Sequence, residues 1–171
     1  SRVDKIRKEL EDLLREDEKR IRDMVKRLRE IDEKIDRELE KVARELRELL
    51  KRVEDSPDDR EEVERMLDEI RRRLDEILER IERLLRESER AVKEVEKESR
   101  RTNDEIKKRL EKVDVPEEVE KKVRELVERT EETVRDVERE NKESVKRVRE
   151  KAETVKREVE KRAKEVRDKA K

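Results

Sequence analysis

The 171-residue sequence contains no cysteine, glycine, histidine or aromatic residue, and only two prolines. Without cysteine it can form no disulfide, and its composition gives no information on redox compartment. Glycine takes positive φ angles at little cost, so natural domains of this length use it at turns and helix ends. A chain without glycine therefore has few turns, or turns chosen to avoid it.

The same absences remove most side chains that carry out chemistry. Without histidine or cysteine there is no imidazole base, thiolate or soft metal ligand, and the serines and threonines lack an activating base. Carboxylates one turn apart, such as Glu61, Glu64 and Asp68, are expected by chance at this charge density, and the Glu-x-x-His pattern of di-metal bundles is missing. No glycine-rich phosphate loop occurs. We expect no enzyme, no cofactor, no metal site and no small-molecule substrate.

Long apolar runs are also absent, which excludes a membrane-spanning helix or a secretory leader in this sequence. The opening Ser1-Arg2 is compatible with a cleaved tag. The 54 basic and 55 acidic residues nearly cancel and are interleaved, whereas nucleic-acid binding needs a concentrated basic face and aromatic stacking. We therefore expect a soluble protein with no membrane or nucleic-acid partner.

What the sequence has is charge and a strict helical period. Charged residues make up 64% of the chain, against about 25% in typical soluble proteins, a composition that also occurs in disordered chains. The periodicity indicates a folded helical chain and not a disordered one, because apolar residues recur at every eighteenth position, as in Val3, Ile21 and Leu39. Eighteen residues make five whole α-helical turns, so this register predicts long, nearly straight helices.

The two prolines divide this register into three segments. Ser56 is a suitable N-cap before Pro57. At the second boundary, Asp114 and Glu117 form a capping-box pattern, and the alternative is Val115 as N-cap with Pro116 at the first helical position. The sequence therefore predicts an all-α, up-down-up antiparallel three-helix bundle. It forms one domain over 1–171, with helices at about 2–54, 57–113 and 116–170.

Eight polar residues interrupt the apolar stripe. Turns near residues 56 and 115 would put Ser88 level with about residue 142 and Ser99 level with about residue 131. Two buried polar layers follow, one around Ser88 and Asn141 and one around Ser99 and Thr130, with Asp17 slightly to one side of the second. The predicted network consists of Asp17, Ser88, Ser99, Thr102, Asn103, Thr130, Asn141 and Ser144.

Such layers would let buried polar groups satisfy one another, since an unpaired one costs about 1–3 kcal/mol. Shared polar layers fix register and partner choice in helical bundles. The alternative is that some of these residues lie at the boundary of the core and bond to backbone or water. For Asp17 the network interpretation also has to accommodate a costly buried carboxylate.

The chain resembles de novo designed helical bundles, which are built from parametric backbones and carry buried hydrogen-bond networks. The register, the Ser56-Pro57-Asp58-Asp59 and Val115-Pro116-Glu117-Glu118 connections, the Lys/Arg/Glu surface and the polar layers carry the resemblance over the whole chain. It implies a structural design with no natural function or location, expected in the cytoplasm of an expression host. A valine-rich third helix, in which Leu126 is the only leucine or isoleucine, departs from the first two.

Two other functional readings remain. The chain could be an interaction module, a heterodimer half, homo-oligomer subunit or caged switch, that presents a helical groove to a partner helix or to a second copy. A natural spectrin-like spacer would carry aromatics and a supercoiled pattern. The flanking apolar positions separate scaffold from module, since an inward stripe needs no partner and an outward one implies a partner. These positions are Leu14, Val25, Ala43, Leu50, Leu67, Leu78, Leu85, Val127, Val145 and Ala163.

Overall fold

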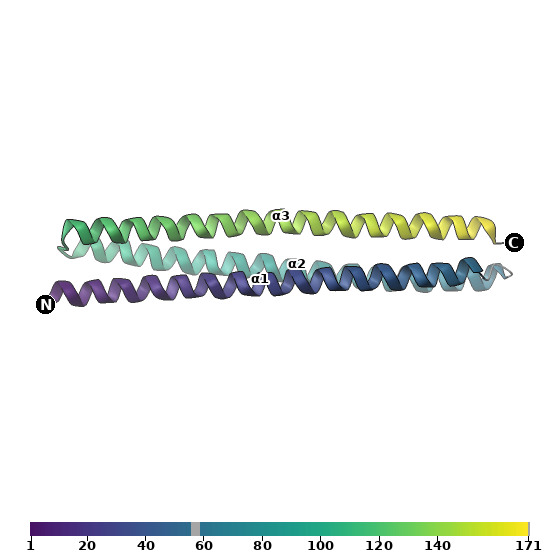
Figure 1. Ribbon diagram of the computed structural model, residues 1–171, viewed down its shortest axis with the longest axis horizontal. Helices are drawn as coiled ribbons and strands as arrows, with labels where there is room; N and C mark the ends of the chain where they lie inside the picture. The colour runs from purple at the N-terminus through teal and green to yellow at the C-terminus, as the bar shows by residue number, and fades with distance from the viewer. Residues whose placement is uncertain (56–58, 171) are drawn as a thin grey trace. The chain divides into compact units, whose positions relative to one another are not determined.

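The computed structural model describes residues 1–55 and 59–170, and this part of the chain forms three α-helices and no strand (Figure 1). The helices are α1 (Arg2–Asp55), α2 (Arg60–Lys112) and α3 (Glu117–Lys169). The predicted all-α three-helix class is confirmed. Ser56, Pro57 and Asp58, on which the predicted first connection depends, lie outside the described residues.

The starts of the second and third helices differ in detail from the sequence prediction. Helix α2 begins at Arg60 and not at residue 57, and its N-cap is Asp59, whose Oδ1 accepts a hydrogen bond of 3.0 Å from the amide of Glu61. Helix α3 begins at Glu117, and the carbonyl of Pro116 accepts the amides of Val119 and Glu120, each at 3.0 Å. Pro116 therefore stands at the N-cap. The two predicted arrangements placed the N-cap earlier, at Asp114 or at Val115.

The chain divides into two compact units, each built from a segment of all three helices. Unit 1 comprises Ser1–Glu30 with Ser88–Glu143, and unit 2 comprises Ile31–Glu87 with Ser144–Lys171. In unit 1 the early part of α1 packs against the late part of α2, so Leu10 and Ile106 share one cluster. In unit 2 the order is reversed, so Leu46 and Ile70 share another. Helices α1 and α2 are thus antiparallel within each unit.

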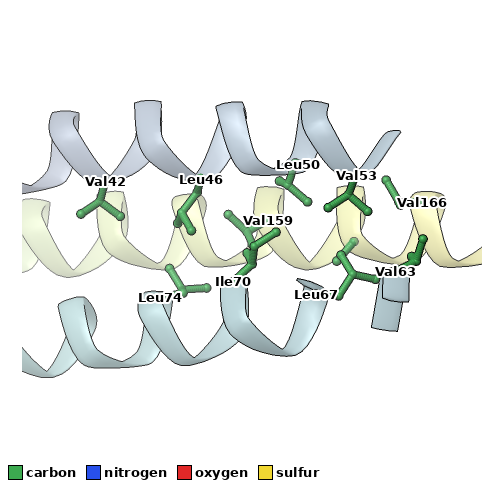
Figure 2. Close-up of a cluster of buried hydrophobic side chains, with 11 residues drawn as sticks. Val42, Leu46, Leu50, Val53, Val63, Leu67, Ile70, Leu74, Val159 and Val166 are labelled. Carbon is green, nitrogen blue, oxygen red and sulfur yellow. The ribbon is translucent and has the colours of Figure 1, made fainter. Parts of the chain in front are cut away.

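Each unit has an aliphatic core, because the apolar stripes of its three helix segments face one another. In unit 2, leucines and valines of α1 meet those of α2 and the smaller Val159, Ala163 and Val166 of α3 (Figure 2). Burial of such side chains contributes roughly 25 cal/mol per Å² of apolar surface. The core residues of unit 1 form two further clusters, around Leu10 and Ile106 and around Met24 and Val92.

The flanking apolar positions turn inward and not outward. Seven of the ten named above are buried, and Val25, Ala43 and Leu78 are partly buried. No large hydrophobic side chain is exposed among residues 1–55 and 59–170. The same residues contain no helix long and apolar enough to cross a membrane.

Candidate functional site: the buried polar layers

The polar residues selected from the sequence lie mostly inside the units. Thr102 and Ser144 are partly buried. The other six are buried, namely Asp17, Ser88, Ser99, Asn103, Thr130 and Asn141. They do not form one network, however, and the hydrogen bonds divide them into separate groups.

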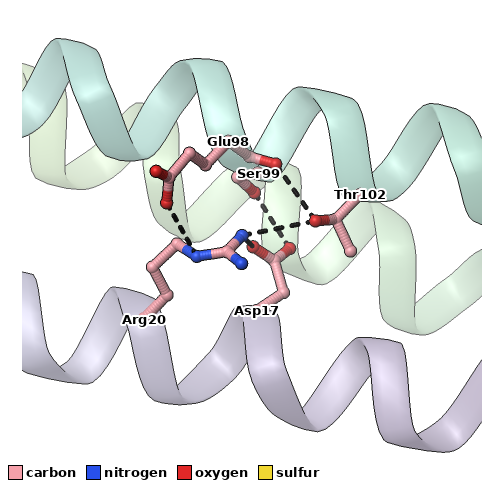
Figure 3. A network of polar contacts seen from close by, with 5 residues as sticks. All are labelled: Asp17, Arg20, Glu98, Ser99 and Thr102. Carbon is pink, nitrogen blue, oxygen red and sulfur yellow. Dashed lines mark hydrogen bonds and ion pairs between the residues drawn. The ribbon is translucent and has the colours of Figure 1, made fainter.

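The first group joins α1 to α2 in unit 1. Ser99 Oγ donates a hydrogen bond of 2.9 Å to Oδ2 of Asp17, a fully buried carboxylate (Figure 3). The sequence had paired Ser99 with Thr130 and put Asp17 to one side. In the structure, the Thr130 hydroxyl donates to the carbonyl of Leu126 in its own helix at 2.9 Å.

The later start of α2 accounts for this change of partner. A turn at residue 56 would bring Asp17 level with a point about five residues before Ser99. Because α2 begins at Arg60, every α2 residue lies further along α1 than that turn predicts, and Ser99 comes opposite Asp17. The connection between α2 and α3 lies near its predicted place, so Ser88 and Asn141 are level as expected.

Arg20 extends the first group toward the surface. Its Nε lies 2.9 Å from Glu98 Oε2, and its Nη1 lies 3.6 Å from Asp17 Oδ1. The same Nη1 donates to Thr102 Oγ1 at 3.3 Å, while the Thr102 hydroxyl donates to the carbonyl of Glu98 at 3.1 Å (Figure 3). Sequence analysis missed Arg20 and Glu98, although Arg20 follows Asp17 by one helical turn. In a chain so rich in arginine, that spacing carries no signal by itself.

Two further hydrogen bonds between helices complete the set. Asn141 Nδ2 donates to Ser88 Oγ at 3.2 Å and so joins α3 to α2 in unit 1. Ser144 Oγ donates to Asp32 Oδ1 at 3.2 Å and joins α3 to α1 in unit 2. Ser144 belongs to the predicted network, whereas Asp32 had not been selected from the sequence.

Asp17 is buried and Asp32 is partly buried, and the pKa of each is raised. Burial raises the pKa of Asp17, and the Ser99 hydrogen bond and the Arg20 charge only partly offset this. Burial also raises the pKa of Asp32, against the lowering effect of the Ser144 hydroxyl. The hydroxyl donors therefore reduce the cost of burying these carboxylates without removing it.

Asn103 belongs to none of these groups. Its Oδ1 is buried and has no hydrogen-bond partner. Its side chain lines an open groove of about 330 Å³ between α2 and α3 in unit 1, together with Ser99, Glu96 and Glu138. A buried acceptor without a partner is unfavourable in a folded protein.

The hydroxyl groups of these layers donate to carboxylates at Ser99 and Ser144 and to backbone carbonyls at Thr102 and Thr130. The Thr102 hydroxyl also accepts from the Arg20 guanidinium. Within residues 1–55 and 59–170, no three acidic side chains are grouped closely enough to hold a metal ion. What the layers can do is link specific positions of neighbouring helices.

Comparison with known proteins agrees with the fold. No protein-family model and no curated protein sequence matches the chain. A solved structure described as a "Computationally designed three helix bundle" superposes with a TM-score of 0.69 at 17% identity, covering 99% of this chain and 90% of that one. The chain is therefore similar in fold to a designed bundle, and at 17% identity the likeness shows the three-helix-bundle fold alone.

Proposed function

We propose that the chain is a computationally designed structural bundle with no natural biochemical function and no catalytic activity, whose buried polar layers set helix register. The designed neighbour and the residue composition support the design origin. The observation that carries the register role is the bond between Ser99 and the fully buried Asp17.

The argument for register rests on the cost of losing that bond. The surrounding core is aliphatic, and aliphatic side chains pack acceptably in several alternative registers. A slip of one residue turns a helical position by about 100° and would separate Asp17 from Ser99. The carboxylate would then be buried without a donor, which costs more than the loss of an ordinary contact. Polar pairs therefore penalise slipped registers that the aliphatic core tolerates.

The register role can be tested by removing the polar pairs together. The variant carries Asp17→Leu, Ser99→Ala, Ser88→Ala and Asn141→Leu, and spin labels are placed at exposed Asp23 and Lys93 of unit 1. We expect helix content to persist while the label-to-label distance distribution broadens or splits. A matched control with Met24→Leu alters the same core without touching a polar pair. A single unchanged distance in the polar-free variant would refute the register role.

The interaction-module alternative requires an apolar face for the partner. The described residues expose no large hydrophobic side chain, which favours a bundle that needs no partner. Sedimentation equilibrium over a wide concentration range tests this choice. We expect the monomer mass throughout, and a concentration-dependent rise in mass would favour self-association.

A further inference from the structure

The groove of unit 1 brings together two carboxyl groups from different helices, Glu96 of α2 and Glu138 of α3. Glu96 Oε1 is buried and has no hydrogen-bond partner. The charged groups that act on the pair are Arg100 of α2 and Lys142 of α3, and Lys142 Nζ lies 3.2 Å from Glu138 Oε1. Lys142 is therefore paired with Glu138, and the effects of Arg100 and Lys142 on the pKa of Glu96 are smaller than those of burial and of the Glu138 carboxyl.

The protonation of this pair follows from that asymmetry. Burial raises the pKa of Glu96, and the adjacent Glu138 carboxyl raises it further. The pKa of Glu138 is lowered, first by hydrogen bonding with Glu96 and then by Lys142. As the pH falls, the first proton that the pair takes therefore goes to Glu96, where it can bond to the Glu138 carboxylate.

Asp17 is the second acid of unit 1 whose carboxylate lacks a hydrogen bond at one of its oxygens. Its Oδ1 is buried without a hydrogen-bond partner, and the Arg20 guanidinium lies 3.6 Å away. The charged groups that act on it are Arg20 and Glu18 of its own helix, while Glu98 of α2 is bonded to Arg20. Among the described residues, α3 contributes no charged group to this set. Protonation would remove a buried charge while leaving the Ser99 bond to Oδ2 in place.

In unit 2, α2 and α3 are linked by an ion pair, whereas in unit 1 two acids face each other across the groove. Arg149 donates to both carboxylate oxygens of Glu82, at 2.7 Å from Nη2 and 3.4 Å from Nε. This pairing lowers the pKa of Glu82. Asp32, whose pKa burial raises, faces Ser144 and Arg147 of α3 and Asp36 of its own helix, and it works against the Glu82 effect. Unit 2 therefore contains one acid of each kind, whereas the two raised acids of unit 1 are opposed only by the partly exposed Glu138.

We propose that unit 1 is a proton-binding module that mild acid strengthens, taking one proton on Asp17 and one on the Glu96–Glu138 pair across the α2–α3 groove. Each proton comes from solvent, converts a carboxylate to a carboxyl group, and returns to solvent when the pH rises.

The sign of the effect follows from proton linkage. Where a pKa is raised by folding, the folded state binds more protons than the unfolded state between the ordinary and the raised values, so stability increases as the pH falls through that range. Where a pKa is lowered, as for Glu82, stability is present above the ordinary value and is lost as the pH falls. Mild acid, above the ordinary pKa values, should therefore strengthen unit 1 through Asp17 and Glu96, whereas the Glu82 contribution is lost only below the ordinary value of a glutamate.

Peptide-resolved hydrogen exchange on the full chain tests this directly. Protection is measured at pH 7 and pH 5 after correction for intrinsic exchange rates, and residues 10–28 and 88–104 of unit 1 are compared with 31–53 and 63–85 of unit 2. We expect a several-fold rise in the protection of unit 1 at pH 5. The double variant Asp17→Asn, Glu96→Gln should abolish that rise, because both substitutions imitate the protonated acids.

Exposed carboxylates of the same types supply the matched control. Asp23→Asn and Glu94→Gln change the net charge equally, and we expect the rise in unit 1 to survive them. If exchange is too slow to measure, carbon-13 titration of the Asp17 and Glu96 carboxyl groups takes its place. Midpoints at the ordinary values of about 3.9 and 4.3 would overturn the proposal. Falling or unchanged protection of unit 1 at pH 5 would also overturn it.

Discussion

At the scale of single residues, Asp17 combines a favourable hydrogen bond with the unfavourable burial of its charge. Its carboxylate gains a bond from Ser99, yet its pKa is raised by burial, so desolvation outweighs the favourable contacts of the charged form. We therefore expect Asp17→Asn to increase the free energy of unfolding at pH 7, by up to about 1–2 kcal/mol, since an amide keeps an acceptor for Ser99. Ser99→Ala should instead decrease it by about 1.5–3 kcal/mol.

Denaturant titration at pH 7 measures both free energies. The opposite signs are the important result, because Asp17→Asn removes the buried charge and keeps an acceptor, whereas Ser99→Ala removes the hydrogen-bond donor. If Asp17→Asn destabilises the protein as much as Ser99→Ala does, the ionised carboxylate is a net stabilising group, and the electrostatic argument fails.

The two buried asparagines offer a matched comparison. Asn103 Oδ1 has no partner, whereas Asn141 donates to Ser88 at 3.2 Å. Asn103→Leu should therefore increase stability, because an unmet acceptor costs about 1–3 kcal/mol. Asn141→Leu should decrease it, since it leaves Ser88 without that bond. Equal changes in the two denaturation midpoints would contradict the hydrogen-bond assignment at these sites.

At the scale of helices, the sequence predicted the elements better than their alignment. The eighteen-residue register is a strong signal because every helical turn repeats it, and the class and number of helices followed from it. The connection between α1 and α2 is a local feature of a few residues, and an error there moves every α2 residue relative to α1. That error separated Asp17 from Ser99 in the prediction. Arg20 and Glu98 were missed because one salt bridge has no signature among so many charges.

Helix α3 should be the least stable element within each unit. Its buried apolar residues are valine and alanine, for example Val134 and Val137 in unit 1 and Val159 and Ala163 in unit 2. Valine buries less surface than leucine and is a weaker helix former because its branched Cβ loses χ1 freedom. We expect residues 119–166 to exchange amide hydrogens earlier than 21–53 and 63–95. Equal protection of all three helices would show that α3 does not open separately.

At the scale of the whole molecule, the question is whether two compact units unfold as one domain. All three helices continue without interruption through the unit boundaries at residues 30–31, 87–88 and 143–144. Unfolding one unit alone would require three helices to end mid-chain, where no cap is encoded and free backbone groups would be left at each break. The single domain predicted over 1–171 therefore remains our expectation, with one cooperative transition.

Core truncations in each unit test that expectation. Leu10→Ala in unit 1 and Leu46→Ala in unit 2 remove fully packed side chains and should each cost about 2–5 kcal/mol. If the units are coupled, either substitution lowers the stability of both, as read by hydrogen exchange in the unit that was not changed. The calorimetric and van 't Hoff enthalpies of unfolding should then agree. Two transitions, with each truncation shifting only its own, would mean that continuous helices do not suffice to couple the units and that the chain contains two domains.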